Sequence, residues 1–114
     1  MSKRDSQLAM HQILSYSREA VEICQGKSRQ DLDSDRLLNL ALTRLLEMIG
    51  EAANRVPDDV RAQYSQLPWS QMIAARNRLI HGYDSVDFDI LWAIINDDLP
   101  VLIRQLIEIL KADQ

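Results

Sequence analysis

The chain has 114 residues, which is enough for one domain with a single hydrophobic core. Apolar residues make up 46% and charged residues 26% of it, proportions that exclude a disordered chain and a fibrous repeat. Three glycines and three prolines leave little turn chemistry for a β-sandwich or barrel. The formal net charge of −4 excludes a protein that coats nucleic acid over its whole surface.

Helical periodicity predicts a first helix over about residues 6–25, and Gly26 suits the left-handed residue that ends many helices. The polar stretch 27–34 is expected to be a loop. A second helix is expected over 35–56, and its apolar positions form two neighbouring stripes. Such a wide apolar face needs contacts on two sides.

A short helix is expected over 57–64, because a proline needs no backbone donor in a first turn and the two following acids favour the helix dipole. A third helix is expected over 69–80, with Gly82 at its end. A fourth is expected over 87–111. Pro100 should kink or split that helix, because its ring blocks one backbone hydrogen bond.

No strand pattern or internal repeat is visible, so residues 1–114 are expected to form one all-α domain, a four- to five-helix up-and-down bundle. The wide apolar faces exceed what one small bundle buries, so we expect a homodimer. Residues 84–114 hold seven acids and two bases. Any site for an anion is therefore expected in the earlier part of the chain.

The longest apolar run, residues 90–95, is too short to cross a bilayer, so no membrane association is expected. The polar start of the chain, Met1-Ser2-Lys3-Arg4-Asp5, predicts no secretory signal. A lone cysteine, Cys24, excludes an internal disulfide and a cysteine-built metal cage. We expect a cytoplasmic protein.

The stretch with the most chemical content is 75–83, Ala-Arg-Asn-Arg-Leu-Ile-His-Gly-Tyr. On a helical projection Arg76 lies in the middle of an apolar arc of the third helix, and Arg78 lies roughly opposite and is expected to be solvated. A guanidinium on an apolar face needs a partner, which could be a carboxylate, carbonyl groups or a bound phosphate. The arc consists of Trp69, Met72, Ile73, Leu79 and Ile80.

His81 follows Arg76 by five residues, or about 140° around an unbroken helix. The two side chains could share a substrate if Gly82 ends the helix there, or if a two-fold axis brings two Arg/His pairs to one groove. Asn77, four residues before His81, could orient the imidazole or bond to a phosphate. Arginine plus histidine suits metal-free RNA cleavage, because the imidazole moves a proton near neutral pH and the guanidinium stabilises charge on the phosphate.

The same residues also have a structural interpretation. Arg76 could be a core charge with an ordinary partner, and a histidine near a helix C-terminus is favoured by the helix dipole alone. Glu47 and Glu51 lie four residues apart on one helical face, which is mildly repulsive unless a cation lies between them. One of them could orient Arg76, or both could be solvated. With two histidines, one cysteine and no clustered ligand spacing, no metal site is expected.

The segment 76–83 resembles the Arg-x4-His-x-Tyr signature of the HepT-like branch of the HEPN superfamily of small all-helical proteins. The resemblance extends upstream through 48–52 and 68–72, and downstream through 83–87, Trp92 and Leu99-Pro100. It covers about two-thirds of the chain, from the second expected helix onward.

This resemblance implies a toxin of a two-gene toxin–antitoxin system, an endoribonuclease whose RNA-cleaving residues are matched by Arg76 and His81. Asn77 matches the polar residue that usually follows the arginine. It implies a homodimer in which two motifs line one cleft, with RNA rather than DNA as the substrate. Tyr83 matches the tyrosine that the antitoxin, an MntA-like minimal nucleotidyltransferase, adenylylates with ATP. The toxin itself needs no cofactor.

A second function from another class stays open. The chain could be a catalytically silent helical module that binds a nucleotidyltransferase partner or a nucleotide. The presence of both Arg76 and His81 favours the enzyme, because a silent module needs neither at this spacing.

Overall fold

The computed structural model describes residues 3–79 and 85–112, apart from the side chains of Arg76 and Ala112. Every regular element in these ranges is helical, which confirms the predicted all-α class. The elements are α1 (Lys3–Cys24), α2 (Asp31–Ser34), α3 (Arg36–Asn54), α4 (Asp58–Gln63), α5 (Trp69–Leu79), α6 (Phe88–Ala93), the π-helical turn η1 (Ile94–Asp98) and α7 (Leu99–Ala112).

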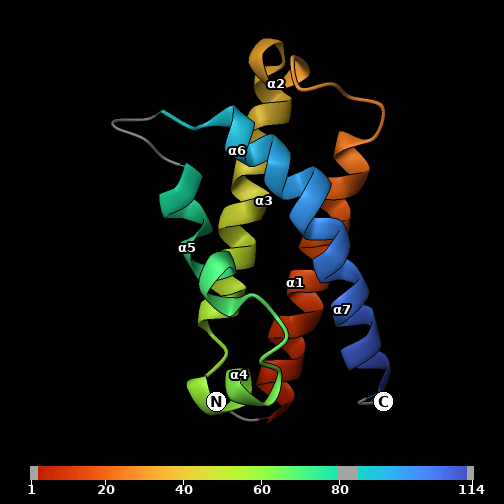
Figure 1. Cartoon of the computed structure of the whole chain (residues 1–114), viewed down its shortest axis with the longest axis vertical. Helices are drawn as coiled ribbons and strands as arrows, with labels where there is room; N and C mark the ends of the chain where they lie inside the picture. The colour runs from red at the N-terminus through yellow and green to blue at the C-terminus, as the bar shows by residue number, and fades with distance from the viewer. Residues whose placement is uncertain (1–2, 80–84, 113–114) are drawn as a thin grey trace.

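The long helices form an up-and-down bundle (Figure 1). Helix α3 lies in the middle and packs against α1 on one side and α5 on the other. The continuous rod α6–η1–α7 descends beside α1, and α4 lies at the end of the bundle where both chain ends are found. No helix among the described residues is long and apolar enough to span a membrane.

The end of α1 follows the prediction. Gly26 has a φ of +75°, in the left-handed region that glycine enters without cost. The amide of Lys27 donates to the carbonyl oxygen of Cys24 over 3.1 Å and satisfies one of the helix's last acceptors.

The expected loop over 27–34 is wrong at its second half, where the one-turn helix α2 forms. Its Leu32 is fully buried, and the Nδ2 amide of Asn39 donates to the Leu32 carbonyl oxygen over 2.9 Å. The Asp31 carboxylate also accepts from the Ser28 amide over 2.6 Å. The burial of Leu32 and these hydrogen bonds stabilise the helical turn. The stretch 27–34 has eight mostly polar residues, so its periodicity does not predict this turn.

Helix α3 begins at Arg36, one residue after the predicted start, and the Asp35 carboxylate caps it by accepting from the Leu38 amide over 3.1 Å. It ends at Asn54, two residues before the predicted end. One of its two apolar stripes is buried as expected, but Leu37, assigned to the other, is 80% exposed, and Leu40 is also exposed. Periodicity identifies an apolar face without saying which part of it a neighbour covers.

The expected interruption near Pro100 is confirmed. The rod opens into the π-helical turn η1, which ends two residues before the proline. A wider turn lets the ring avoid the carbonyl group four residues back, with which it would clash in a regular α-helix. Buried side chains lie on both sides of this turn, Leu91 before it and Leu102 after it, so the rod stays continuous across the core.

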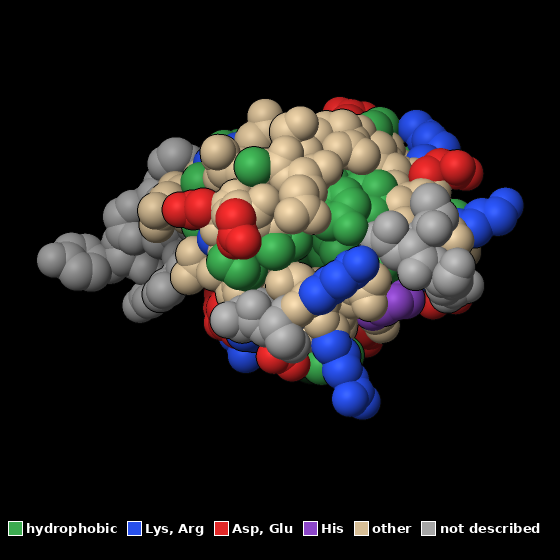
Figure 2. Space-filling view, turned by 90° about the horizontal axis from the view of Figure 1, so that it is seen from below, with side chains coloured by type: hydrophobic (Ala, Val, Ile, Leu, Met, Phe, Trp, Pro, Cys, Tyr) green, Lys and Arg blue, Asp and Glu red, His purple; other side chains and the backbone are tan. Residues whose placement is uncertain are grey.

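The end of the bundle that carries α4 presents a mixed surface. Figure 2 shows apolar side chains in its middle, with basic side chains projecting singly and acidic ones among them. Such alternation is typical of a solvated surface and not of a continuous anion-binding patch.

Candidate functional site

The candidate motif lies on α5, whose start is fixed by three hydrogen bonds. The Trp69 amide donates to the Leu67 carbonyl oxygen over 2.9 Å, and the Met72 amide donates to that of Pro68 over 3.0 Å. The indole Nε1 of Trp69 donates to the Tyr64 carbonyl oxygen over 3.0 Å. The beginning of α5 is therefore tied to the segment that leads into it.

The buried face of α5 differs in part from the predicted arc. Trp69, Met72 and Leu79 are buried as expected, but Ile73 is only half-buried, and Ala75, which the prediction left out, is buried. The buried arc is therefore centred near Met72 and shifted toward Ala75. On the helix, position 76 lies between positions 72 and 73.

The two residues that follow position 76, Asn77 and Arg78, are exposed, Arg78 as predicted. The side chain of Arg76 and the whole of Ile80, His81, Gly82 and Tyr83 lie outside the described residues. The predicted roles of Arg76, His81 and Tyr83, and the helix end at Gly82, therefore remain predictions.

The end of α5 and the start of α6 are joined directly. The amide of Asp87 donates to the carbonyl oxygen of Leu79 over 2.7 Å. Leu79 is the last residue of α5 and is buried, and Asp87 immediately precedes α6. The end of α5 and the start of α6 are thus adjacent in space.

Helix α5 lies unusually close to α3 at Gly50. A Cβ atom built on Gly50 would stand 2.8 Å from the carbonyl oxygen of Met72, a distance that real Cβ contacts do not show. Only glycine allows this approach without displacement of one backbone. The contact fixes α5 on α3 one turn before position 76.

Beside this contact, α3 and α5 border an open hollow of about 220 Å³. Glu47, Glu51 and Asn54 line it from α3, and Ile73 lines it from α5. Both predicted glutamates therefore lie next to α5, at the level of Ile73, which is three residues before Arg76. The sequence placed them on one face of α3, and the fold turns that face toward α5.

The two glutamates share a cation. The Arg44 Nη1 atom lies 3.2 Å from an oxygen of Glu51 and 3.4 Å from an oxygen of Glu47. This is the arrangement that relieves the repulsion expected for two acids four residues apart. Arg44 was not singled out from the sequence, although its i, i+3 and i, i+7 spacings to the two acids were legible there.

A second hollow, of about 40 Å³, lies between α5 and the rod η1–α7. Its lining is mostly apolar, with Met72 and Ala75 from α5 and Leu102 from α7, and Arg78 and Asp98 also border it. This space is large enough for a small side chain and too small for a nucleotide.

No group of three or more metal-ligating side chains occurs among residues 3–79 and 85–112. Cys24 is buried, and this burial raises the pKa of its thiol. A thiol that stays protonated is a poor nucleophile, so Cys24 is a core residue.

These features define a class: a small all-α bundle in which the third long helix, whose sequence carries a short polar motif, packs at Met72 against a glycine of the central helix. A family model described as "Ribonuclease HepT-like" matches residues 13–109 of the chain. The chain belongs to this HepT-like family of the HEPN superfamily.

Three relatives illustrate the similarity. A "Putative RNase" of Methanocaldococcus jannaschii is 33% identical over 105 residues, which are 92% of this chain and 96% of the relative. A "Putative RNase" of Caldanaerobacter subterraneus is 34% identical over 105 residues, 92% of this chain and 94% of the relative. A "Probable ribonuclease HepT" of Thermococcus cleftensis is 35% identical over 88 residues, 74% of this chain and 80% of the relative. No solved structure matches the chain significantly.

Proposed function

We propose that this protein is a metal-independent endoribonuclease that cleaves RNA as a homodimer, with Arg76 and His81 as the catalytic residues. Membership of the HepT-like family and the RNase names of its relatives support RNA cleavage. The Arg-x4-His spacing supports the assignment of these two residues, since no other histidine lies near α5 in the sequence.

The proposed reaction needs no external reagent. The 2′-hydroxyl of the substrate attacks the adjacent phosphorus, and His81 moves a proton from that hydroxyl or to the departing 5′-oxygen. The bond from phosphorus to the 5′-oxygen breaks, which leaves a 2′,3′-cyclic phosphate and a 5′-hydroxyl. The Arg76 guanidinium stabilises the negative charge that builds on the phosphate oxygens, and Asn77 bonds to the phosphate or orients the imidazole.

The observation that carries this proposal is the fixed position of α5 on α3. The Gly50–Met72 approach and the three hydrogen bonds at the start of α5 immobilise the helix one turn before Arg76. Catalysis by positioned groups requires such a rigid support, because a misplacement of about 1 Å costs about 100-fold in rate. The open hollow beside Ile73 borders the motif helix.

Homodimerisation is supported by exposed apolar side chains on the same helix that borders the site. Leu37 and Leu40 lie on the outer face of α3, 80% and 48% exposed. Arg44 and Glu51 follow one another along that face toward the motif helix. A second subunit covering Leu37 and Leu40 would bring two motifs to one groove.

The resemblance further supports a toxin role, with an MntA-like nucleotidyltransferase as antitoxin that uses ATP to adenylylate Tyr83. An adenylyl group on Tyr83 would add bulk and negative charge two residues after His81 and so oppose RNA binding. The protein would act in the cytoplasm and need no cofactor of its own.

The test is cleavage of a labelled RNA in EDTA by purified wild type, Arg76→Ala and His81→Ala. We expect each variant to lose at least about 100-fold in rate, the usual share of a general acid or base. His11→Ala is the matched control, because His11 is the other histidine of the chain and lies exposed on α1. Equal cleavage by wild type and His81→Ala would refute the assignment.

One observation favours the alternative, a catalytically silent module that binds a nucleotidyltransferase. Glu47 and Glu51 border the hollow beside the motif helix, and carboxylates repel RNA phosphates. Wild-type protein that leaves RNA and cell growth unaffected yet binds the nucleotidyltransferase would establish this alternative.

A further inference from the structure

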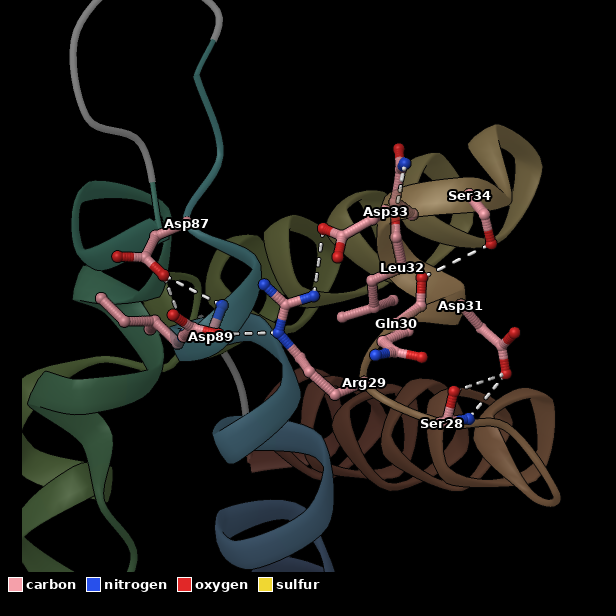
Figure 3. A network of polar contacts seen from close by, with 11 residues as sticks. Ser28, Arg29, Gln30, Asp31, Leu32, Asp33, Ser34, Asp87 and Asp89 are labelled. Atoms are coloured by element: carbon pink, nitrogen blue, oxygen red, sulfur yellow. Dashed lines mark hydrogen bonds and ion pairs between the residues drawn. The ribbon is translucent and has the colours of Figure 1, made fainter.

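Arg29 links two parts of the fold that are far apart in the sequence. Its Nε atom lies 2.7 Å from an Asp89 carboxylate oxygen, and its Nη1 atom lies 3.1 Å from an Asp33 carboxylate oxygen. Figure 3 shows the guanidinium lying between these two acids. One acid belongs to α2 and the other to the first turn of α6, so the bond to Asp89 joins the α1–α2 connection to the start of α6.

The Arg29 side chain is well restrained. Its guanidinium carbon lies 5.9 Å from the centre of the Phe88 ring, within the range of a cation–π contact. Its hydrogen bonds to Asp89 and then Asp33 raise its pKa further above its ordinary value, so it is always charged. The side chain is 32% exposed, whereas Asp89 is 85% exposed. Arg29 is therefore the partner that holds Asp89 at the surface.

The start of α6 also lies beside the end of α5. The Asp87 carboxylate accepts from the amides of Asp89 and Ile90 over 3.0 and 3.1 Å. The Asp87 amide donates to the carbonyl oxygen of Leu79. The residues on either side of segment 80–86, Leu79 and Asp87, are thus joined by one hydrogen bond. In the sequence this segment carries His81 and Tyr83. Asp87 directly precedes Phe88 and Asp89, the two residues of α6 that Arg29 contacts.

We infer that Arg29 is a positioning residue for the motif: by holding Phe88 and Asp89 against the α1–α2 connection, it fixes the downstream end of segment 80–86. The consequence for RNA cleavage rests on the proposed function. Arg29 itself lies far from α5 in the sequence and acts on the start of α6 through Phe88 and Asp89. Its effect should therefore appear in the turnover rate and not in RNA affinity.

Two variants break the link, and one serves as a matched control. Arg29→Gln and Asp89→Ala remove either partner of the bond to α6. Asp33→Ala removes the other acid, which likewise lies in the first turn of a short helix but has no bond to α6. We expect Arg29→Gln and Asp89→Ala each to lower kcat by about fivefold with KM within about twofold, and the double variant to be no slower than either. Asp33→Ala should leave kcat within about twofold of wild type.

Hydrogen exchange of the amides of residues 87–90 supplies a readout that does not need activity. Arg29→Gln and Asp89→Ala should speed this exchange, and Asp33→Ala should not. Unchanged exchange in Arg29→Gln would overturn the inference, and faster exchange with an unchanged kcat would overturn the positioning role. If wild type cleaves no RNA, the proposed function fails, while faster exchange confined to the first two variants still upholds the anchor.

Discussion

Gly50 of α3 and Met72 of α5 make a backbone contact that leaves no room for a side chain, because a Cβ on Gly50 would stand 2.8 Å from the Met72 carbonyl oxygen. A backbone oxygen cannot rotate away as the end of a flexible side chain can. Any larger residue at position 50 must therefore move α5, and α5 carries the motif.

Gly50→Ala should destabilise the protein and slow RNA cleavage. Overpacking of this kind costs about 1–3 kcal/mol, while alanine regains about 1 kcal/mol in helix propensity. We therefore expect a net loss of about 1 kcal/mol in the free energy of unfolding, measured by urea denaturation. The fluorescence of Trp69, at the start of α5, should report the displacement.

Gly26→Ala is the control for this variant. Gly26 needs its positive φ, but a Cβ there would meet nothing within 4 Å. Its substitution should cost about 1 kcal/mol through backbone strain alone and leave RNA cleavage unchanged. A more stable Gly50→Ala protein with full activity would show that α3 and α5 tolerate a wider spacing.

The π-helical turn η1 should accept the loss of one residue. A π turn accommodates about one extra residue, so deleting exposed Asp97 together with Pro100→Ala should give a regular α-helix with both buried faces still in register. Deleting exposed Arg104 in place of Asp97, again together with Pro100→Ala, should rotate the rest of α7 by about 100° and turn Leu106 out of the core. Circular dichroism melts should show a shift of a few degrees for the first deletion and no cooperative transition for the second. Equal losses for both would contradict a π turn as the cause of the interruption.

The sequence predicted most of the fold because local signals agreed with tertiary packing. Gly26 and Pro57 mark two helix boundaries, and the structure has each of them within two residues of its predicted place. Pro57 itself is the capping residue of α4 and not its first helical residue. The exposed Leu37 and the buried turn at Leu32 escaped prediction because they depend on which neighbours cover a face, and periodicity does not contain that information.

The candidate site was predictable in its parts and not in its arrangement. The spacing put Glu47 and Glu51 on one face of α3, but only the packing of α5 brings that face beside Ile73. The local pair with Arg44 was legible from spacing and was missed. Arg29 could not have been found, since its partner Asp89 lies 60 residues away.

Cys24 should resist alkylation in the folded protein. Its burial raises the pKa of the thiol above the ordinary value of 9.0, so at pH 8 the sulfur atom is both inaccessible to the reagent and protonated.

The direction of this pKa shift also predicts how the stability of the protein depends on pH. Below pH 9.0 the thiol is neutral in both states, whereas above it the unfolded chain loses the proton first, so the free energy of unfolding falls as the pH rises. Iodoacetamide labelling followed by mass spectrometry checks the first expectation, and Cys24→Ser should weaken the decline in stability above pH 9. Rapid labelling of native protein at pH 8 would contradict the buried placement.

Asp87 and Asp35 cap two helices by the same chemistry. Asp35 therefore serves as a matched control for the effect of Asp87 on the motif segment. Each carboxylate accepts from the amide three residues later, Ile90 and Leu38, over 3.1 Å. Asp87→Ala and Asp35→Ala should each lose about 1 kcal/mol in the free energy of unfolding, because a helix N-cap is worth about that much. Only Asp87→Ala should also slow RNA cleavage, because loss of this cap loosens the start of α6, where the backbone amide of residue 87 donates to the Leu79 carbonyl oxygen. Asn at either position retains the capping oxygen and should restore most of the loss. Equal cleavage by both alanine variants at matched stability would show that the end of segment 80–86 does not influence the reaction.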